Sequence, residues 1–307
     1  MPLSVYETFV KDKKLGFSNT TAKIFITDSI KSLILTLIFG FLLIFLLISC
    51  FEFLGKFWWI VGFLLSFAVI LGVNLIYPTL IAPLFNKMSP LENGELKSQI
   101  EAILARAGFK SSGVFIIDAS RRDTRLNAYF GGFGATKRVV LFDTLIKKLS
   151  IDEILAVLGH ELGHFKHGDI FKNLVLMFFV LFALFAVFGN IPMSVFEALN
   201  LEKNGATTMV ILLMFSPILN AIFQPIISYF SRAHEFGADE FGADIKNATQ
   251  MISALKKLGT QNLAFPIAHP LYSAVYHSHP TLFERIKELE NRSDFKPSTQ
   301  TENLDEN

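Results

Sequence analysis

Two histidines four residues apart are the residues of this chain most suited to chemistry. They are His160 and His164 in the pentapeptide His-Glu-Leu-Gly-His, with Glu161 between them. On a helix, side chains four positions apart share a face, so both imidazoles can bind one metal ion. Glu161 projects in a neighbouring direction, where it can reach a water on that metal. The spacing predicts a zinc site in which zinc lowers the pKa of a water and Glu161 takes its proton. Alternatively, both histidines have only a structural role and bind no metal.

The helix that must carry this motif is well specified. Ser150 and Glu153 have the spacing of a capping box, which satisfies backbone N–H groups at a helix start. Apolar residues then recur at helical spacing and predict one buried face, namely Ile151, Ile154, Leu155 and Leu158. Gly159 and Gly163 leave room close to the backbone. Support of this kind favours a buried functional helix over a solvated one.

A third metal ligand is expected downstream, because a catalytic zinc typically has three protein ligands and one open position. Glu235 is the best candidate, and Asp239 lies four residues later on the same helix face. We interpret Asp239 as the acceptor for the outer N–H of a ligating histidine or as an aid to proton transfer. His234 is the rival ligand, but it would point away from that face. Arg232 either pairs with the carboxylates or marks the cytoplasmic end of a span.

Composition places the site in a membrane protein. The chain has 307 residues, of which 51% are hydrophobic and 18% charged, whereas average soluble domains have about 25% charged residues. Four uncharged runs are long enough to cross a hydrocarbon core of roughly 30 Å, and they cover residues 32–51, 57–86, 173–196 and 204–231. We predict four transmembrane helices, of which the second ends or bends near Tyr77. Polar residues and prolines within the spans serve either helix packing or a wet cavity.

Charge predicts the orientation in the bilayer. Four crossings place both termini and the central segment on one side, and that side carries most of the lysines and arginines. The positive-inside rule therefore predicts a metal site on the cytoplasmic side. A net charge of +1 gives no support for nucleic-acid binding. The single cysteine, Cys50, excludes an intrachain disulfide.

These assignments define the fold class as mainly α. We predict a polytopic membrane protein with transmembrane helical hairpins and a cytoplasmic, zincin-like metallopeptidase domain that contains a small β-sheet. The predicted segments are a polar N-terminal segment (1–31), two transmembrane helices (32–86), a soluble catalytic insertion with the metal-binding helix (87–168), two further transmembrane helices (169–231), a C-terminal catalytic segment (232–292) and a disordered tail (293–307).

Three further segments suit a peptide substrate. Residues 113–118 and 138–143 have the pattern of buried strands. Residues 127–134 fit an edge strand and turn beside the metal-binding helix, which would take an extended peptide by strand addition. An ordinary hairpin is the alternative. His277 or His279, just before a helix, could donate a hydrogen bond to a tetrahedral oxyanion, or could be structural, and the sequence does not separate the two.

Several motifs in one order resemble a known family. They are found in residues 9–17, 81–87, 127–130, 137–145, 157–164, 231–239 and 278–285. Over about residues 5–291 the chain resembles the type 1 CAAX prenyl protease family, which comprises multi-span membrane zinc metallopeptidases. Members typically have seven spans, so the resemblance implies a form that lacks the N-terminal spans and part of the wall of the intramembrane chamber.

The resemblance also implies roles for individual residues. It implies His160, His164 and Glu235 as zinc ligands and Glu161 as the catalytic glutamate. Near these ligands, the resemblance implies Asp239 as a supporting acid and places His279 near the oxyanion. It also places Asn127, with its neighbours Ala128 and Tyr129, at the strand that binds the substrate.

The predicted function is that of a zinc-dependent endopeptidase with one Zn²⁺ per chain. Its substrates would be membrane-associated or C-terminal, CAAX-like peptides, cleaved by a water that Glu161 activates. The alternatives are a general quality-control metalloprotease for membrane proteins and a non-catalytic, zinc-stabilised membrane scaffold. Expected partners are a peptide or membrane-protein substrate and the lipid bilayer, with no nucleic acid. Abundant Phe, Ile, Lys and Asn favour a bacterial origin, and therefore a bacterial inner membrane. The natural substrate, recognition of a prenyl group and the oligomeric state stay open.

Overall fold

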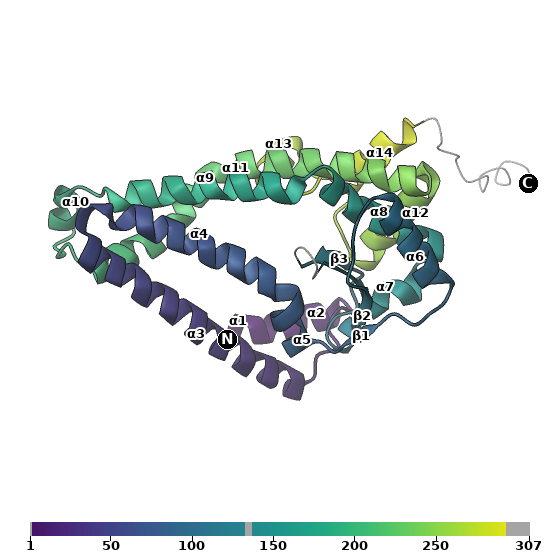
Figure 1. The fold of residues 1–307 in the computed structure, drawn as a ribbon, viewed down its shortest axis with the longest axis horizontal. Helices are drawn as coiled ribbons and strands as arrows, with labels where there is room; N and C mark the ends of the chain where they lie inside the picture. Colours follow the sequence, from purple (N-terminus) through teal and green to yellow (C-terminus); the bar gives the residue numbers. More distant parts are fainter. Residues whose placement is uncertain (1, 133–136, 293–307) are drawn as a thin grey trace, which may run out of the picture. The chain divides into compact units, whose positions relative to one another are not determined.

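The protein is described by a computed structural model that covers residues 2–132 and 137–292, and these form two compact units (Figure 1). The apolar unit comprises residues 21–85 and 170–227. The mixed unit comprises the described parts of 1–20, 86–169 and 228–307. The predicted disordered tail lies outside the described residues, as do Phe133 and Gly134 of the predicted turn.

Long apolar helices build the apolar unit. Three continuous helical stretches of the described chain are long and apolar enough to cross a membrane, and they are Ala22–Phe85, Asp169–Gly189 and Gly205–Ile245. The first stretch reverses at Gly55, whose φ of +51° is favourable for glycine. It therefore contains two rods, α3 (Ala22–Leu54) and α4 (Trp58–Ile76), seen side by side in Figure 1. The four predicted spans thus correspond to α3, α4, α9 and α11.

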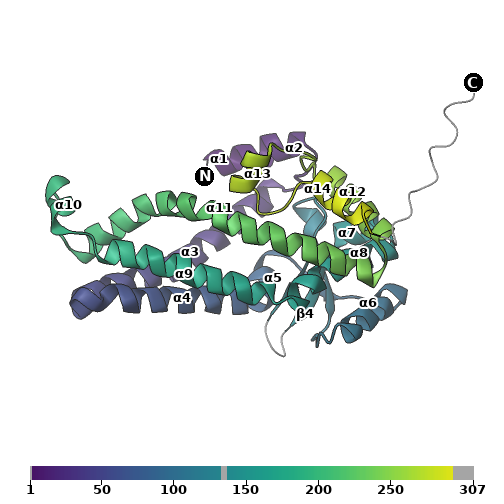
Figure 2. The ribbon, with the colours of Figure 1, turned by 90° about the horizontal axis from the view of Figure 1, so that it is seen from above.

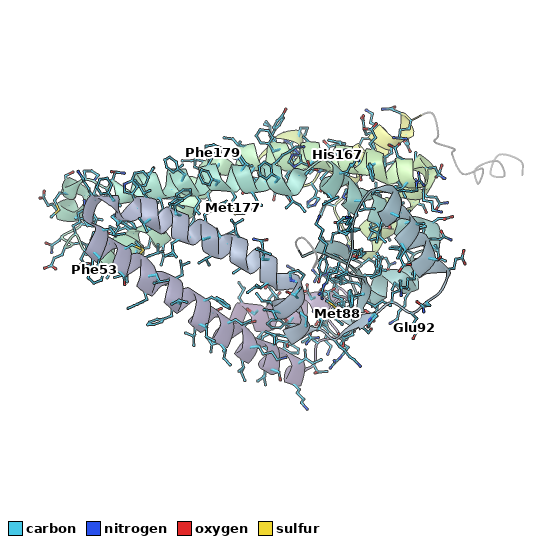
Figure 3. The ribbon with its side chains drawn as sticks, in the orientation of Figure 1. Phe53, Met88, Glu92, His167, Met177 and Phe179 are labelled. Atoms are coloured by element: carbon cyan, nitrogen blue, oxygen red, sulfur yellow. The ribbon has the colours of Figure 1, made fainter. Side chains whose placement is uncertain are left out.

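Aromatic side chains hold these helices together. Phe63 of α4 packs edge-on against Phe178 and Phe182 of α9, with ring centroids 4.8 and 5.5 Å apart. Large apolar side chains also cover the outside of the unit, where Phe41 is 72% and Phe53 is 87% exposed. Figure 3 labels Phe53, Met177 and Phe179 among these exposed side chains. An apolar exterior of this kind matches a lipid environment.

The helix ends explain two features of the sequence. Helix α4 ends at Ile76, and a π-helical turn with Pro78 near its start leads into α5 (Ala82–Phe85). The predicted end near Tyr77 is therefore confirmed. Helix α11 (Gly205–Ile245) continues well beyond the apolar run that predicted it. Its later residues carry Glu235 and Asp239, so a single helix contributes to both units.

A four-stranded sheet lies in the mixed unit. Its strands are β1 (Met88–Pro90), β2 (Val114–Ile117), β3 (Ala128–Gly131) and β4 (Arg138–Phe142). The order is β1-β2-β4-β3, with β2 and β4 parallel and the outer strands antiparallel to their neighbours. Both predicted buried strands and the predicted edge strand are confirmed. The side chains of Val139 and Leu141 face a helical layer, while that of Val140 joins a smaller cluster on the other face.

Helices cover the sheet and complete the mixed unit. Helix α8 (Ile151–Lys166) packs against α6 (Glu95–Arg106) and β3, while α12 (Ala248–Gln261) packs against both α8 and α14 (Leu282–Glu290) (Figure 2). The remaining helices are α1 (Pro2–Tyr6), the π-helical turn Glu7–Lys11, α2 (Asp12–Lys14), α7 (Asp143–Lys148), α9 (Asp169–Gly189), α10 (Met193–Ala198) and α13 (Pro270–Tyr276). This arrangement places α8 between the sheet and α12.

Candidate metal centre and active site

Helix α8 begins as the sequence predicts. The Ser150 side chain accepts a hydrogen bond from the N–H of Glu153, and the Glu153 carboxylate accepts one from the N–H of Ser150, which completes the capping box. The buried face of the helix includes Leu155, Leu158 and Leu162. These contacts fix the rotation of α8, so that His160 and His164 are directed away from the sheet core.

Glycines bring α8 and α11 into direct backbone contact. A β-carbon at Gly163 would lie 2.8 Å from the Cα atom of Ala238, and one at Gly242 would lie 2.9 Å from the carbonyl oxygen of Ala156. Real β-carbons do not approach other atoms this closely, so only glycine fits at these positions. The close approach places Glu235 of α11 opposite the two histidines of α8.

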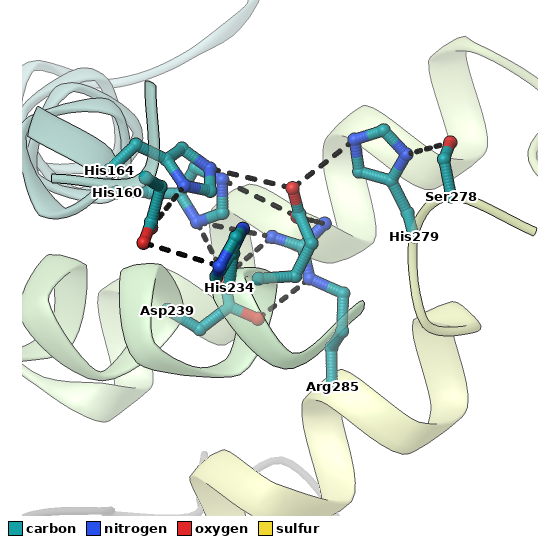
Figure 4. Close-up of polar contacts among 9 residues, drawn as sticks. His160, His164, His234, Asp239, Ser278, His279 and Arg285 are labelled. Carbon is teal, nitrogen blue, oxygen red and sulfur yellow. Dashed lines mark hydrogen bonds and ion pairs between the residues drawn. The ribbon is translucent and has the colours of Figure 1, made fainter. Parts of the chain in front are cut away.

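The three predicted ligands converge on one point. One ligand atom each from His160, His164 and Glu235 lies within 4.8 Å of the others. The Nε2 atom of His160 is 3.5 Å from Glu235 Oε2, and that of His164 is 3.4 Å from Glu235 Oε1. Figure 4 labels the two imidazoles from α8 together with Asp239 of α11 and Arg285 of α14, which surround the same group of polar atoms. The structure therefore assembles residues that lie 71 to 75 positions apart in the sequence.

Buried carboxylates hold the other nitrogen of each imidazole. The Nδ1 atom of His160 is 2.8 Å from Asp239 Oδ1, and that of His164 is 3.1 Å from Asp169 Oδ2. Because an ionised carboxylate only accepts, each Nδ1 carries the hydrogen and each Nε2 presents its lone pair to the metal position. Asp239 was expected here, whereas sequence reasoning missed Asp169. Its signal was an aspartate five residues after His164.

Arg285 balances the negative charge around the ligands. Its guanidinium donates to Asp239 through Nε (2.7 Å) and Nη2 (2.5 Å), and its Nη1 lies 3.3 Å from Glu235 Oε2. Sequence reasoning included Arg285 only within a family motif and gave it no role. Pairing with these carboxylates was one of two interpretations of Arg232, and the structure does not show it. Arg232 donates to three backbone carbonyls at the end of α13.

These residues fit a zinc ion. Two neutral imidazoles and one carboxylate are a typical ligand set for catalytic zinc, and they leave a fourth position open. Glu235 Oε2 is fully buried and, apart from its ion pair with Arg285 Nη1, accepts no hydrogen bond from the described residues, so it remains able to bind a metal cation. The two outer carboxylates orient the imidazoles as in known zinc centres. The chain therefore has a zinc site formed by His160, His164 and Glu235.

A cavity of about 710 Å³ opens onto this zinc site. Glu161 and the three ligands line it, together with Asn127 and Ala128 at the start of β3. Burial raises the pKa of Glu161, and the neighbouring histidines only partly oppose that effect. A carboxyl group with a raised pKa beside a metal is suited to both accept and return a proton.

The remaining predicted residues lie at different distances from the ligands. His279 Nε2 is 3.3 Å from Glu235 Oε1, and its Nδ1 is 2.9 Å from the hydroxyl of Ser278. His277 lines the cavity but stacks edge-on against Tyr272. His234 Nε2 lies 3.6 Å from Asp169, outside the ligand set. Tyr129 packs on the other face of the sheet, against Phe142.

The fold and site together define a zinc metallopeptidase carried by membrane helices. A family model described as peptidase family M48 matches residues 90–293, and one described as CAAX prenyl protease N-terminal, five membrane helices, matches residues 1–87. The chain belongs to the CAAX prenyl protease 1 family of M48 zinc metallopeptidases, and it is an integral, multi-pass membrane protein and a hydrolase.

Individual relatives agree with this assignment. The chain is 36% identical over 316 residues to CAAX prenyl protease 1 of Saccharomyces cerevisiae, covering 96% of this chain and 70% of the yeast protein. It is 33% identical to the CAAX prenyl protease 1 homolog of Homo sapiens, covering 94% of this chain and 70% of the human protein. The crystal structure of S. mikatae Ste24p superposes with a TM-score of 0.88 at 35% identity, over 94% of this chain and 72% of that chain.

Proposed function

We propose that this protein is a membrane-embedded endopeptidase that hydrolyses membrane-associated or C-terminal, CAAX-like peptides. The observation that carries the proposal is the placement of Glu161 in the same cavity as the three zinc ligands and the β3 edge. A purely structural zinc site has no use for a general base in an open cavity. This argues against a zinc-stabilised scaffold.

Glu161 is the proton carrier of the proposed reaction. Zinc supplies Lewis acidity, which polarises the scissile carbonyl and lowers the pKa of the attacking water. Glu161 accepts the proton of that water as the oxygen attacks the carbonyl carbon. The same carboxyl then gives the proton to the leaving amine nitrogen as the C–N bond breaks.

The edge strand β3 is proposed to hold the peptide backbone. It is the outer strand of the sheet, with β4 on one side, and Asn127 and Ala128 line the cavity that contains the ligands. An extended peptide can add to such an edge through main-chain hydrogen bonds. Strand addition would hold the scissile bond beside the ligands without requiring a particular side chain.

The polar groups around the ligands have supporting roles in this proposal. Asp239 and Asp169 keep the imidazoles in the orientation that zinc needs. His279, whose ring nitrogen faces the ligand group, is proposed to donate a hydrogen bond to the oxyanion.

The substrate class and the side of the membrane are also proposed. Relatives of similar sequence are named CAAX prenyl proteases, which supports C-terminal, CAAX-like peptides as substrates. The excess of lysine and arginine in the segments outside the apolar helices supports a cytoplasmic active site. The abundance of Phe, Ile, Lys and Asn supports a bacterial inner membrane.

Glu161→Gln tests the mechanism. The substitution removes the proton acceptor and keeps the shape of the side chain, so cleavage should fall by about 10²–10⁴-fold, while zinc content stays at one per chain. Cleavage of prenylated and unprenylated peptides and zinc content are measured for both proteins. Glu240→Gln is a matched control, because Glu240 is an exposed carboxylate on α11. Undiminished turnover in Glu161→Gln contradicts the mechanism.

Substrate profiling separates the proposed activity from general quality control. Peptides that end in a CAAX-like sequence are compared with unfolded membrane-protein segments of similar length. Cleavage confined to the short C-terminal peptides supports the proposal, whereas equal cleavage of internal segments supports quality control.

A further inference from the structure

The outer edge of β3 is closed at one end by a side chain. Residues of antiparallel strands alternate, with one residue bonding its partner strand and the next directing its backbone groups away from it. The N–H of Phe142 donates to the carbonyl of Asn127 at 3.1 Å, so Asn127 faces β4. Its neighbours Leu126 and Ala128 therefore direct their N–H and C=O groups away from β4, toward the edge that a peptide would join.

Asn262 occupies this edge at Leu126. The N–H of Leu126 donates to Asn262 Oδ1 at 2.9 Å, and Asn262 Nδ2 donates to the carbonyl oxygen of Leu126 at 3.2 Å. One amide side chain thus forms the two bonds that a residue of an added strand would form with Leu126. Leu126 is 3% exposed, and both residues line the cavity that contains the zinc ligands.

The position of Asn262 is fixed from its own side of the contact. It ends α12, and its N–H donates to the carbonyl of Leu258 at 2.9 Å. The next residue, Leu263, has a φ of +48°, which turns the chain away from the helix. The preceding carbonyl of the edge segment, that of Arg125, accepts a hydrogen bond from Thr144 at 2.9 Å. The Asn262 side chain and the Leu126 backbone are therefore both held in place, and neither can shift relative to the other.

We propose that Asn262 is a positioning residue that ends the peptide-binding edge at Leu126 and so fixes the register of the substrate backbone. The inference rests on the proposed addition of the substrate to β3. A peptide can pair with the edge at Phe130 and at the carbonyl of Ala128, whose N–H donates to Asn127 Oδ1 at 2.8 Å. It cannot continue past Leu126, where both backbone groups are already bonded. If the substrate strand shifted by one residue along β3, every substrate side chain would turn to the opposite face of the sheet. The substrate can therefore shift only in steps of two residues. Blocking the edge at Leu126 prevents slips in that direction, so the peptide end that reaches Asn262 determines which peptide bond lies beside the ligands.

Cleavage-site mapping tests this role. A peptide with several equivalent bonds is incubated with the wild type, Asn262→Ala and Asn262→Asp, and the products are identified by mass spectrometry. The wild type should cut one bond. Asn262→Ala should cut additional bonds two residues away, because the freed N–H and C=O of Leu126 can then bond the peptide in a further register. Asn262→Asp keeps the acceptor for the Leu126 N–H and should give an intermediate result.

Two controls separate register from folding and from metal binding. Gln261→Ala removes the exposed neighbouring amide at the end of α12 and should match the wild type. Zinc content, measured independently of activity, should stay at one per chain in every variant. A positioning role moves the cleavage site with zinc still bound, whereas a structural role would lower zinc content and rate together at an unchanged site.

A second measurement uses only the wild type. Peptides are lengthened one residue at a time at either end, and KM is expected to stop falling at one end once the peptide reaches Asn262. A single unchanged cleavage site in zinc-loaded Asn262→Ala, with kcat/KM within twofold of the wild type, overturns the positioning role and leaves the endopeptidase assignment standing. A wild-type protein that cleaves no peptide overturns both.

Discussion

The two units of this protein fix their helices mainly by different means. In the apolar unit, α4 and α9 meet mostly through aromatic rings, such as those of Phe63 and Phe178. A close approach also lies at the end of α9, where a β-carbon at Gly189 would overlap the Cβ atom of Trp59. In the mixed unit, α8 and α11 meet backbone to backbone at Gly163 and Gly242. The aromatic contact is broad and consists of side-chain atoms that can move. The glycine contact between α8 and α11 leaves no space for the backbones to move closer together.

The difference follows from what each unit has to hold. Helices in a bilayer need mainly an apolar exterior and dense packing, and many aromatic arrangements supply these. A zinc site needs its ligand atoms placed to within about 0.5 Å. The mixed unit meets that demand with glycine contacts and with carboxylates that fix His160 and His164. Substitutions should therefore be tolerated very differently at these two kinds of contact.

Arg285→Leu should have the largest effect on the mixed unit. The substitution leaves the carboxylates of Asp239 and Glu235 buried without their cationic partner. Removing one member of a buried ion pair costs about 3–5 kcal/mol. We expect a large loss of thermal stability in detergent, and a loss of zinc content because Asp239 no longer holds His160 in place.

The matched control for this prediction is Arg292→Ala. Arg292 pairs with Asp244 at 2.6 Å on the surface of the same unit, where Asp244 is more than half exposed. Exposed pairs contribute about 0–1 kcal/mol, so stability and zinc content should both stay near the wild-type values. Equal effects of the two substitutions would contradict the buried ion-pair network as the feature that holds the ligands.

Gly163→Ala should have the next largest effect. Its β-carbon would lie 2.8 Å from the Cα atom of Ala238 and 3.1 Å from the Cβ atom of Phe241, so α8 and α11 have to separate. Overpacking of this kind costs about 1–3 kcal/mol. Separation also moves Glu235 away from the histidines. Thermal unfolding should show a lower melting temperature than that of the wild type, and a zinc-binding titration should show a lower affinity for zinc.

Gly72→Ala is the comparison in the apolar unit. Gly72 lies within α4, and a β-carbon there would have no neighbour within 4 Å. Alanine is a better helix former than glycine by about 1 kcal/mol, so this variant should be as stable as the wild type or slightly more stable. A destabilisation as large as that of Gly163→Ala would mean that the cost at Gly163 does not come from its close contact with α11.

The sequence was sufficient to predict the features that depend on local spacing. The capping box at Ser150, the pair of histidines four residues apart and the strands around Val114 and Val139 each have a signal within a few residues. Glu235 could be predicted because a metal requires a third ligand and because Glu235 closely follows the fourth apolar run, with Asp239 four residues later on the same helix face. Four membrane helices could be predicted because apolar length is a direct requirement of the bilayer.

The features that the sequence did not predict depend on how distant segments meet. Arg285 reaches Asp239 across 46 residues, and Asn262 reaches Leu126 across 136. Nothing near either residue signals its partner. Asp169 lies only five residues from His164, but their contact depends on the turn at Gly168, whose φ is +70°. Such contacts are consequences of the packed structure, so a single sequence does not show them.

Glu153→Gln should have the smallest effect, and that effect should depend on pH. Burial alone would raise the pKa of Glu153, but hydrogen bonds from Lys257, Ser253 and the Ser150 N–H outweigh burial and hold the pKa below its ordinary value. A depressed pKa stabilises the folded state above the ordinary value of about 4.3, and the contribution is lost as the pH falls through the lower folded pKa. At pH 7 the variant should be less stable by about 1 kcal/mol, and the difference should disappear in acid. Thermal unfolding between pH 7 and 3 measures it.

Asp152→Asn separates this effect from other consequences of acid. Asp152 is half exposed and pairs with Lys246 on the surface, one residue from Glu153 in the same helix turn. Loss of zinc at low pH affects the wild type and both variants alike, because none of these carboxylates is a ligand. The stability of Asp152→Asn should stay within about 0.5 kcal/mol of the wild type throughout. If the stability of Glu153→Gln is instead lower than that of the wild type by the same amount at every pH, the substitution acts through packing. The contact between α8 and α12 would then not depend on the charge of Glu153.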